Sequence, residues 1–247
     1  MTTDPLIVRH PGPSRLIVLT GGRLLTAVLD ALAARGEAHV ALTGGSMGSA
    51  VIAALAEHPA LDAVDWSRVH FWWGDERYLP AGDPDRNDTQ NDDAGLRAIA
   101  GDSERVHRVG GPDAVDSAEE AARLYEEELR VHAPGTFDVV MLGVGPDGHV
   151  ASLFPGHSAQ RSSGSAVAVH DSPKPPATRV SLTAQRLSDA REVWFIVSGE
   201  DKAPAVANGV AGAPATQDST GLVRGQLRTL WLVDEAAASA VTAPEGH

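Results

Sequence analysis

Short apolar runs alternate along the chain with longer stretches in which apolar residues recur at helical spacing. Short runs rich in β-branched and aromatic side chains are typical of strands, whereas a period near 3.6 residues is typical of helices. The runs predict strands over Leu6–Val8, Ala38–Leu42, Val69–Trp73, Phe137–Leu142, Val193–Val197 and Thr229–Val233. The helical spacing predicts helices over Arg15–Arg35, Met47–Glu57, Glu119–Val131 and near Lys202–Val210. In the third helix the predicted apolar face holds Ala121, Leu124, Tyr125 and Leu129.

The alternation of strands and helices predicts the fold class. Strand–helix–strand units place their strands in a parallel sheet with helices on both faces. The run Phe137–Leu142 agrees, because a nearly continuous apolar strand is covered on both faces. We therefore predict an α/β fold of three αβα layers, Rossmann-like, with a mostly parallel central sheet. No internal repeat or linker divides the sequence, so a single domain over residues 1–247 is expected, with surface loops at Gly82–Asp93 and Ser172–Ala177.

The composition is that of an ordinary globular protein. Hydrophobic residues make up 43% of the sequence, and there is no cysteine, so neither a disulfide nor a thiolate metal site can form. The segment Met1–Arg15 carries prolines in place of the apolar stretch of a secretory signal. No run approaches the roughly 18 apolar residues of a membrane span. A cytoplasmic protein without membrane contact is therefore expected.

The charge balance argues against nucleic acid as a partner. The chain has 20 Lys and Arg against 33 Asp and Glu, which gives a formal net charge of −13. Such a surface repels a polyanion, and no Lys/Arg cluster is long enough to form a basic face. The same charge repels a small anion at long range. A phosphate-bearing ligand therefore requires cations gathered in one cleft.

Glycine-rich and charged segments follow the predicted strands. In open α/β sheets ligands bind at the carboxyl ends of the strands, where the strand order reverses, so these segments are expected to meet there. The first is Gly44-Gly45-Ser46, between the strand Ala38–Leu42 and the next helix. Its backbone N–H groups and the helix N-terminus suit a phosphate. A tight turn with Ser46 as the helix N-cap explains the same residues equally well.

The second segment ends the next strand and reads WWGDER (72–77). Arg77 offers a forked donor for a phosphate, and a carboxylate beside it can lie near the reacting atoms. The alternative, which this segment taken alone favours, is a surface ion pair. Whether Asp75 or Glu76 touches a ligand stays open. The two tryptophans are expected to pack in the core.

The third segment runs from Gly143 to His149 and carries the glycine spacing of a dinucleotide-binding turn, with Asp171 roughly 20 residues further on. That interpretation requires a full crossover helix after the glycines. Pro155 and Gly156 end any helix about two turns in. We therefore favour a hydrolase site over a dinucleotide site at this turn.

His149 is the candidate general base, because imidazole exchanges protons near neutral pH. Asp147 lies close enough in sequence to orient the ring. A histidine that satisfies a buried carbonyl is the alternative. The sequence has no His-Glu-x-x-His pattern and no Gly-x-Ser-x-Gly nucleophile elbow. We therefore expect activated water as the nucleophile, and neither a metal nor a cofactor.

Two further cations are candidates for a phosphate. Arg179 opens the run Arg179–Thr183, and Lys202 stands at the start of a predicted helix. A lysine near a helix N-terminus opposes the helix dipole unless an anion lies nearby, which favours a phosphate partner. A solvated surface lysine is the plain alternative.

Six segments together resemble the 6-phosphogluconolactonase family. They are LTGGSMGSAV (42–51), HFWWGDERYLP (70–80), FDVVMLGVGPDGHVASLFPG (137–156), SPKPPATRVSLT (172–183), VSGEDKA (197–203) and TLWLVDEAAAS (229–239). They stand in the family's order and cover nearly the whole chain, so the combination is far more specific than any one glycine motif. Thr43 stands where many relatives carry a serine, a change that leaves the backbone role of the turn intact.

The resemblance implies the three-layer αβα fold of sugar-phosphate isomerases and deaminases. It also implies hydrolysis of 6-phospho-D-glucono-1,5-lactone to 6-phospho-D-gluconate in the oxidative pentose phosphate pathway, with His149 as general base. The residues it implies for holding the substrate, chiefly its phosphate, are Gly44, Gly45, Ser46, Arg77, Arg179 and Lys202. The expected partner is thus a small phosphosugar lactone, and the expected state is a monomer or a weak homo-oligomer.

Two other functions stay open. Glucosamine-6-phosphate deaminases resemble Asp-Gly-His-x-Ala-Phe-Asn-Glu-Pro, with a glutamate five residues after the histidine that helps to open the sugar ring. This chain has Phe154 at that position, and a lactone needs no such carboxylate because water opens it directly. A sugar-phosphate sensor of the same fold is the non-catalytic alternative, although neither end of the sequence is expected to hold a DNA-binding segment.

Overall fold

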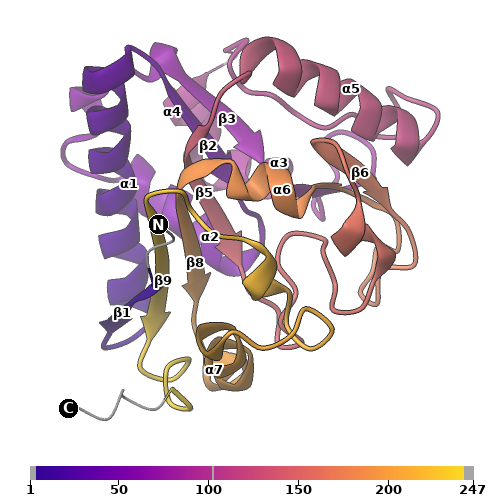
Figure 1. Ribbon diagram of the computed structural model, residues 1–247. Helices are drawn as coiled ribbons and strands as arrows, with labels where there is room; N and C mark the ends of the chain where they lie inside the picture. Colours follow the sequence, from indigo (N-terminus) through magenta and orange to yellow (C-terminus); the bar gives the residue numbers. More distant parts are fainter. Residues whose placement is uncertain (1–3, 102, 242–247) are drawn as a thin grey trace.

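A sheet of six parallel strands forms the centre of the molecule (Figure 1). The computed structural model describes residues 4–101 and 103–241, so the predicted single domain and the segment Met1–Arg15 extend partly outside the described residues. From one edge to the other the strands are β1 (Leu6–His10), β9 (Arg228–Asp234), β8 (Ala190–Val197), β5 (Phe137–Gly143), β2 (Ala38–Leu42) and β3 (Val69–Trp73). All neighbouring pairs run parallel, which confirms the predicted sheet.

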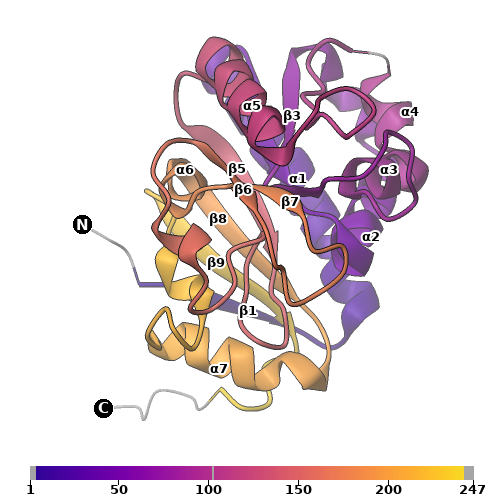
Figure 2. The ribbon, with the colours of Figure 1, turned by 90° about the vertical axis from the view of Figure 1, so that its right-hand side faces the viewer.

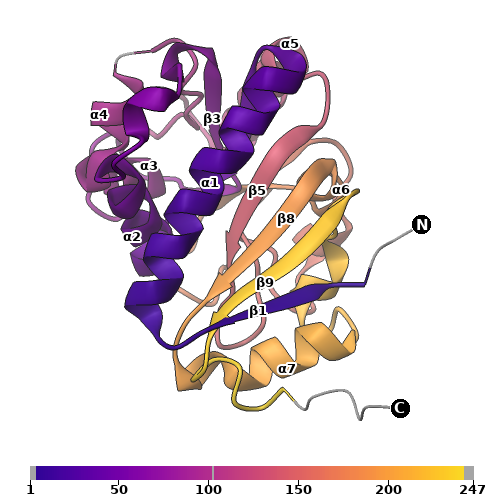
Figure 3. The same ribbon diagram turned by 90° about the vertical axis from the view of Figure 1, so that its left-hand side faces the viewer.

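Helices cover both faces of this sheet and make the three predicted layers (Figures 1 and 3). On one face lie α1 (Pro13–Arg35) and α2 (Gly45–Ala56). On the other lie α5 (Ala118–His132), α6 (Ala184–Ser188) and α7 (Ala203–Ala211). The α/β class and the layers are therefore as the sequence predicts. The single domain stays a prediction.

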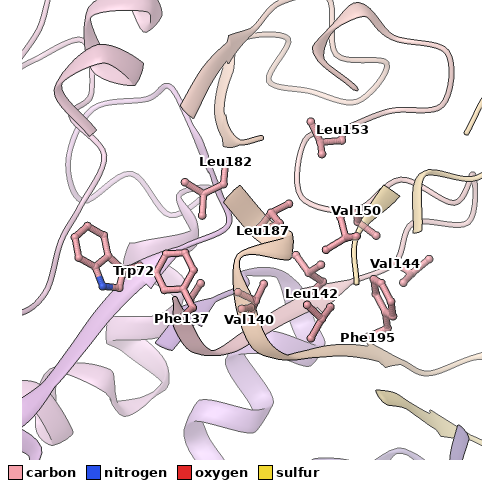
Figure 4. Packing of buried hydrophobic residues seen from close by; sticks show 14 of the residues in the cluster. Trp72, Phe137, Val140, Leu142, Val144, Val150, Leu153, Leu182, Leu187 and Phe195 are labelled. Carbon is pink, nitrogen blue, oxygen red and sulfur yellow. The ribbon is translucent and has the colours of Figure 1, made fainter. Parts of the chain in front are cut away.

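Alternate side chains of the strands fill two separate cores. In β5, Val140 and Leu142 belong to the core on the α5 side, whereas Val139 and Met141 belong to the core under α1 and α2. Figure 4 shows the first core, where Leu142 and Val140 lie near Phe137. Burial on both faces explains why the run from Val139 to Leu142 is apolar at every position.

Helix α1 packs tightly on its neighbours although its composition is unusually apolar. By length and composition its 23 residues would suffice to cross a membrane, contrary to the expectation from the sequence. Leu24 and Val28 are buried on the sheet, and at Gly21 a Cβ would lie 3.2 Å from the backbone nitrogen of Leu55 in α2. Gly21 thus permits the close contact of the two helices, and one face of α1 packs on the sheet and on α2.

A second, antiparallel sheet lies beside the first and is not predicted by the sequence pattern (Figure 2). Its strands are β4 (Asp75–Arg77), β7 (Arg179–Leu182) and β6 (Ala166–Val169), in that order. The chain passes from β3 to β4 at Gly74, whose N–H donates to Leu42 O at 2.9 Å and whose oxygen accepts from Leu182 N–H at 2.8 Å. Strands of three and four residues are too short to leave a readable period.

The prediction of a surface loop at Gly82–Asp93 is right for Gly82–Asp85, which form largely exposed turns, and wrong for the residues from Arg86 to Asn91. Arg86, Asp88 and Asn91 are 1%, 4% and 0% exposed, and the segment forms helix α3 (Asn87–Asn91). Arg86 donates to the two carboxylate oxygens of Asp88 from Nε and Nη2, at 2.8 Å each. A polar segment is buried here because its charges pair with each other. The composition of the segment alone does not predict such pairing.

Helix α5 follows the prediction except at Leu124, which is 42% exposed. Ser117 caps the helix by accepting from the N–H of Glu120 at 3.2 Å. The remaining short helical segments are Leu61–Ala63, Trp66–Arg68, Asp92–Leu96, α4 (Arg97–Ala100), Ser158–Arg161, Glu200–Lys202 and Ser219–Leu222.

The strand order reverses between β2 and β5. From β2 the chain moves to β3 on one side, then returns to β5 on the other side and continues to β8 and β9. Folds of this class bind ligands at the carboxyl ends of the strands beside such a reversal.

Candidate active site

A cavity of about 180 Å³ opens at the carboxyl ends of β2 and β5. Its walls come from segments far apart in the sequence, namely Thr43, Gly44, Gly45, Asp75, Arg77, Asn87, Gly143, Val144, Gly145, Pro146, His149, Ala151, Lys174, Arg179 and Lys202. Every predicted site residue except Ser46 and Asp147 lines it. Larger hollows of about 900 and 850 Å³ lie beside α1 and α5, away from these side chains.

The turn after β2 brings backbone N–H groups to the cavity. Gly44 is the N-cap of α2 and Gly45 its first residue, with a φ of 73° that favours glycine. The N–H of Gly45 donates to Gln90 Oε1 at 3.1 Å. Ser46 is exposed and is not the N-cap, so the alternative of a serine-capped turn is wrong. The glycines lie where a helix N-terminus can receive an anion.

The turn after β5 is built around two close backbone contacts. The N–H of Gly145 donates to His149 O, and that of Gly148 donates to Gly145 O, both at 2.9 Å. A Cβ at Gly145 would collide with the imidazole of His149 and with Oδ1 of Asp147. No α-helix follows between Gly143 and the short helical turn at Ser158 in this described stretch, which argues against a dinucleotide-binding unit.

His149 and Asp147 form a hydrogen-bonded pair at the mouth of this turn. Nδ1 of His149 lies 2.6 Å from Oδ1 of Asp147. Burial alone would raise the pKa of Asp147, but the hydrogen bond to His149 and the charge of Lys174 outweigh it and hold this pKa well below its usual range. The ionised carboxylate accepts only, so it fixes the ring proton on Nδ1 and leaves Nε2 as the basic nitrogen.

Phe154 packs on the same imidazole. The two ring centroids are 4.6 Å apart, and Phe154 is 2% exposed. This is the position at which the deaminase pattern carries a glutamate. The side chain in contact with His149 at this point is therefore apolar and offers no proton.

Two of the predicted cations keep donors free for a ligand. Lys202 precedes α7, and its Nζ lies 3.0 Å from Asp201 Oδ2 with 24% of the side chain exposed. Arg77 donates from Nη1 to Asp85 O, while its buried Nε has no hydrogen-bond partner among the described residues. A buried donor without a partner carries a free-energy cost that an anionic ligand can remove.

Arg179 plays a more internal part than the sequence predicts. It is 4% exposed, donates from Nε to Pro176 O at 3.2 Å, and donates from Nη2 to the oxygens of Lys174 and Pro175 at 3.1 and 3.2 Å. Its Nη1 lies 3.8 Å from Asp75 Oδ2. Arg179 thus holds the loop after β6, and its predicted contact with substrate stays a prediction.

The carboxylates of β4 are buried and serve different purposes. Asp75 lines the cavity and accepts from Ser152 Oγ at 2.6 Å. Glu76 is 1% exposed and accepts from the N–H groups of Asn87 and Asp88 at 2.7 and 2.8 Å, so it caps α3. Burial and the charge of Asp88 raise the pKa of Glu76 to about 7. The interpretation of these acids as a surface ion pair is wrong.

Sequence reasoning missed two polar residues of the cavity, Asn87 and Lys174. Both lie in segments predicted to be surface loops. Asn87 donates from Nδ2 to Asp75 O at 2.7 Å, and its side chain occupies the space that a Cβ on Gly44 would need. The Pro-rich segment Ser172–Ala177 gives the signal for Lys174, because prolines stiffen a loop and fix what it carries.

Comparison with known proteins gives the family. The family model described as "Glucosamine-6-phosphate isomerases/6-phosphogluconolactonase" matches residues 12–231. The chain belongs to this family. Within it, the 6-phosphogluconolactonase of Streptomyces coelicolor is 47% identical to the chain, and the match covers 97% of this chain and 95% of that protein. The 6-phosphogluconolactonase of Mycobacterium tuberculosis is 42% identical, with 93% and 95% covered.

Solved structures of the family share the fold. The 6-phosphogluconolactonase of Thermotoga maritima superposes with a TM-score of 0.80 at 26% identity, covering 94% of this chain and 99% of that one. The Trypanosoma cruzi 6-phosphogluconolactonase gives 0.84 at 25% identity, covering 98% and 99%. A monomeric glucosamine-6-phosphate deaminase gives 0.75 at 19% identity, with 95% and 99% covered, which shows a common fold only.

Proposed function

We propose that this chain hydrolyses 6-phospho-D-glucono-1,5-lactone to 6-phospho-D-gluconate, a reaction of the oxidative pentose phosphate pathway. The observation that carries the proposal is the imidazole of His149, oriented by Asp147 inside a cavity that Arg77 and Lys202 also line. The family relatives that match nearly the whole chain carry the name 6-phosphogluconolactonase. We further propose that the protein works in the cytoplasm, as a monomer or a weak homo-oligomer.

In the proposed reaction His149 is the general base. Its Nε2 takes a proton from water as the water oxygen attacks C1 of the lactone. The new C–O bond forms, the carbonyl electrons move to oxygen, and on their return the bond between C1 and the ring oxygen breaks. The ring oxygen leaves as an alkoxide and takes the proton back from His149. The product acid then releases its own proton to solvent, so atoms and charge balance.

Anchoring of the phosphate is proposed for the cationic side of the cavity. Lys202 and Arg77 supply the positive charge. The N-terminus of α2 at Gly44 and Gly45 supplies backbone donors, with the phosphate replacing Gln90 Oε1 as acceptor of the Gly45 N–H. Ser46 lies beside this turn and is proposed as an outer contact. Because the net charge of the chain is −13, these local cations decide whether a phosphosugar binds.

The deaminase alternative is disfavoured by Phe154. Ring opening of an amino sugar calls for a further proton-transferring group beside the histidine, and the side chain there is a buried phenyl ring. Attack of water on a lactone needs only one base and a cavity that positions the ester.

The test is a rapid assay with freshly generated 6-phosphogluconolactone, corrected for spontaneous hydrolysis. We expect enzyme-dependent acid release, and no ammonia from glucosamine-6-phosphate measured beside it. Ammonia release without lactone hydrolysis would assign the chain to the deaminases. Tight binding of the phosphosugar with no turnover of either compound would favour the sensor.

A further inference from the structure

A lysine outside the predicted site faces both members of the catalytic pair. Lys174 lies in the loop Ser172–Ala177, and its side chain is 39% exposed. Its Nζ is 3.3 Å from Oδ1 of Asp147 and 3.5 Å from Nδ1 of His149. One carboxylate oxygen therefore meets both the imidazole and the ammonium group.

The backbone of this lysine is fixed from inside the protein. Lys174 O accepts from Ser172 Oγ at 2.9 Å and from Arg179 Nη2 at 3.1 Å. Arg179 is 4% exposed and lies 3.8 Å from the buried Asp75. A surface lysine that pairs with a solvated acid usually contributes little, because its long side chain must be ordered first. Here the hydrogen bond from Arg179 to Lys174 O fixes the backbone from which the lysine side chain extends, so less of the side chain remains to be ordered.

We propose that Lys174 is a positioning residue of the catalytic pair, which holds the Asp147 carboxylate against His149 and offsets the negative charge of that carboxylate. This inference rests on the proposed role of His149 as general base. An anion beside an imidazole favours the protonated ring, and a protonated ring cannot take a proton from water. A cation at a similar distance opposes that effect. Asp147 thus orients the ring while Lys174 opposes the effect of the carboxylate charge on it.

Other charges around the cavity act on the same imidazole from further away. Those that face the cavity from the neighbouring elements are Asp75, Arg77, Arg179 and Lys202. Asp218, which is buried, acts electrostatically on Asp147. Lys174 differs from all of these because its Nζ lies within 3.5 Å of the ring nitrogen.

The experiment compares Lys174→Met with Lys174→Arg in the full chain. Methionine keeps the aliphatic stem and removes the charge, whereas arginine keeps the charge. In Lys174→Met we expect the acid limb of the pH profile of kcat/KM to move up by about one pH unit, because the protonated imidazole loses a repelling neighbour. In Lys174→Arg the acid limb should stay at its wild-type position. Asp147→Asn should move the limb the opposite way.

A second readout does not depend on turnover. The ring signals of His149, identified by their loss in His149→Asn, are followed by NMR against pH in the substrate-free protein. Their midpoint should shift with the kinetic limb in Lys174→Met. An unchanged midpoint in folded Lys174→Met, or in Lys174→Gln if the first variant does not fold, overturns the inference. If the wild-type protein lacks lactonase activity but the midpoint still shifts, the proposed function fails and the electrostatic contact stands.

Discussion

Histidines gather at both ends of the central sheet, and their surroundings differ sharply. At the carboxyl ends of the strands, His149 faces a cavity and pairs with a carboxylate at 2.6 Å and an ammonium group at 3.5 Å. At the amino ends, His39 and His70 stack with ring centroids 4.4 Å apart. His107 lies on Trp72 with centroids 3.8 Å apart. Both groups have charged partners, but His149 faces the cavity that Arg77 and Lys202 also line, whereas His70 and His107 are buried among aromatic rings.

We call the three amino-end histidines, His39, His70 and His107, the histidine stack. Two of them, His70 and His107, form a directed chain of hydrogen bonds that ends on Glu128. His70 Nδ1 lies 2.8 Å from His107 Nε2, and His107 Nδ1 lies 2.7 Å from Glu128 Oε1. Because the carboxylate accepts, His107 carries its proton on Nδ1 and accepts from His70. Residue type alone thus does not mark a catalytic histidine. What distinguishes His149 is the set of side chains around it, because it shares its cavity with Arg77 and Lys202, whereas His70 and His107 bond to each other.

Removal of the imidazole at residue 149 is the strongest test of this contrast. His149→Asn should lower kcat by about 10²- to 10⁴-fold, because general-base assistance is removed while the phosphate contacts remain. The measurement is initial-rate kinetics on the lactone. His132→Asn is the matched control, since its side chain is 45% exposed and does not line the cavity of His149, and kcat of this variant should stay at the wild-type value. Wild-type kcat in His149→Asn would remove this residue from the mechanism.

Much of the central sheet follows from local pattern. Runs such as Val139–Leu142 are apolar because both faces are covered. The same run therefore predicts both the strand and its position inside a parallel sheet. The short strands of the second sheet are not readable, because β4 reads Asp-Glu-Arg and is held by pairing with β7 and by burial of Asp75 and Glu76. Such contacts join residues about 100 positions apart and leave no trace in a local window.

In the candidate site, too, some residues could be predicted from the local sequence and others could not. Gly44, Gly45 and His149 could be predicted because a glycine turn after a strand has a physical purpose that local sequence expresses. The Pro-rich segment marks Lys174 as part of a stiff loop, but its contact with Asp147 could not be predicted, because it depends on the hydrogen bond from Arg179 to Lys174 O. For Arg179, sequence could identify a cation near the site but not that two of its nitrogens hold loop carbonyls.

The histidine stack should matter for stability and not for chemistry. His107→Ala should lower the free energy of unfolding by about 2–4 kcal/mol, because it opens a gap against Trp72 and leaves Nδ1 of His70 without its partner. Urea unfolding measures this loss. At temperatures where the variant is folded, kcat should equal that of the wild type. A tenfold fall in kcat with unchanged stability would contradict the separation of the two ends.

The smallest expected effect is a change in how stability depends on pH. Burial lowers the pKa of all three imidazoles of the histidine stack, and burial together with the charges of His39 and Arg105 lowers that of His70 to about 3. An unfolded histidine binds its proton near pH 6.5. Between these two values the unfolded chain therefore holds a proton that the folded chain does not, so stability falls as pH falls from about 6.5 towards 3. His70→Asn removes one such group. The slope of unfolding free energy against pH should then drop by up to about 1.4 kcal/mol per pH unit between pH 6 and 4, measured by urea unfolding at a series of pH values.

The slope is the quantity to compare, because the substitution also changes the baseline stability through the lost stacking and hydrogen bond. Parallel curves for wild type and variant would mean that His70 gains its proton equally well in the folded protein, and the contrast between the two ends of the sheet would then lose its electrostatic basis.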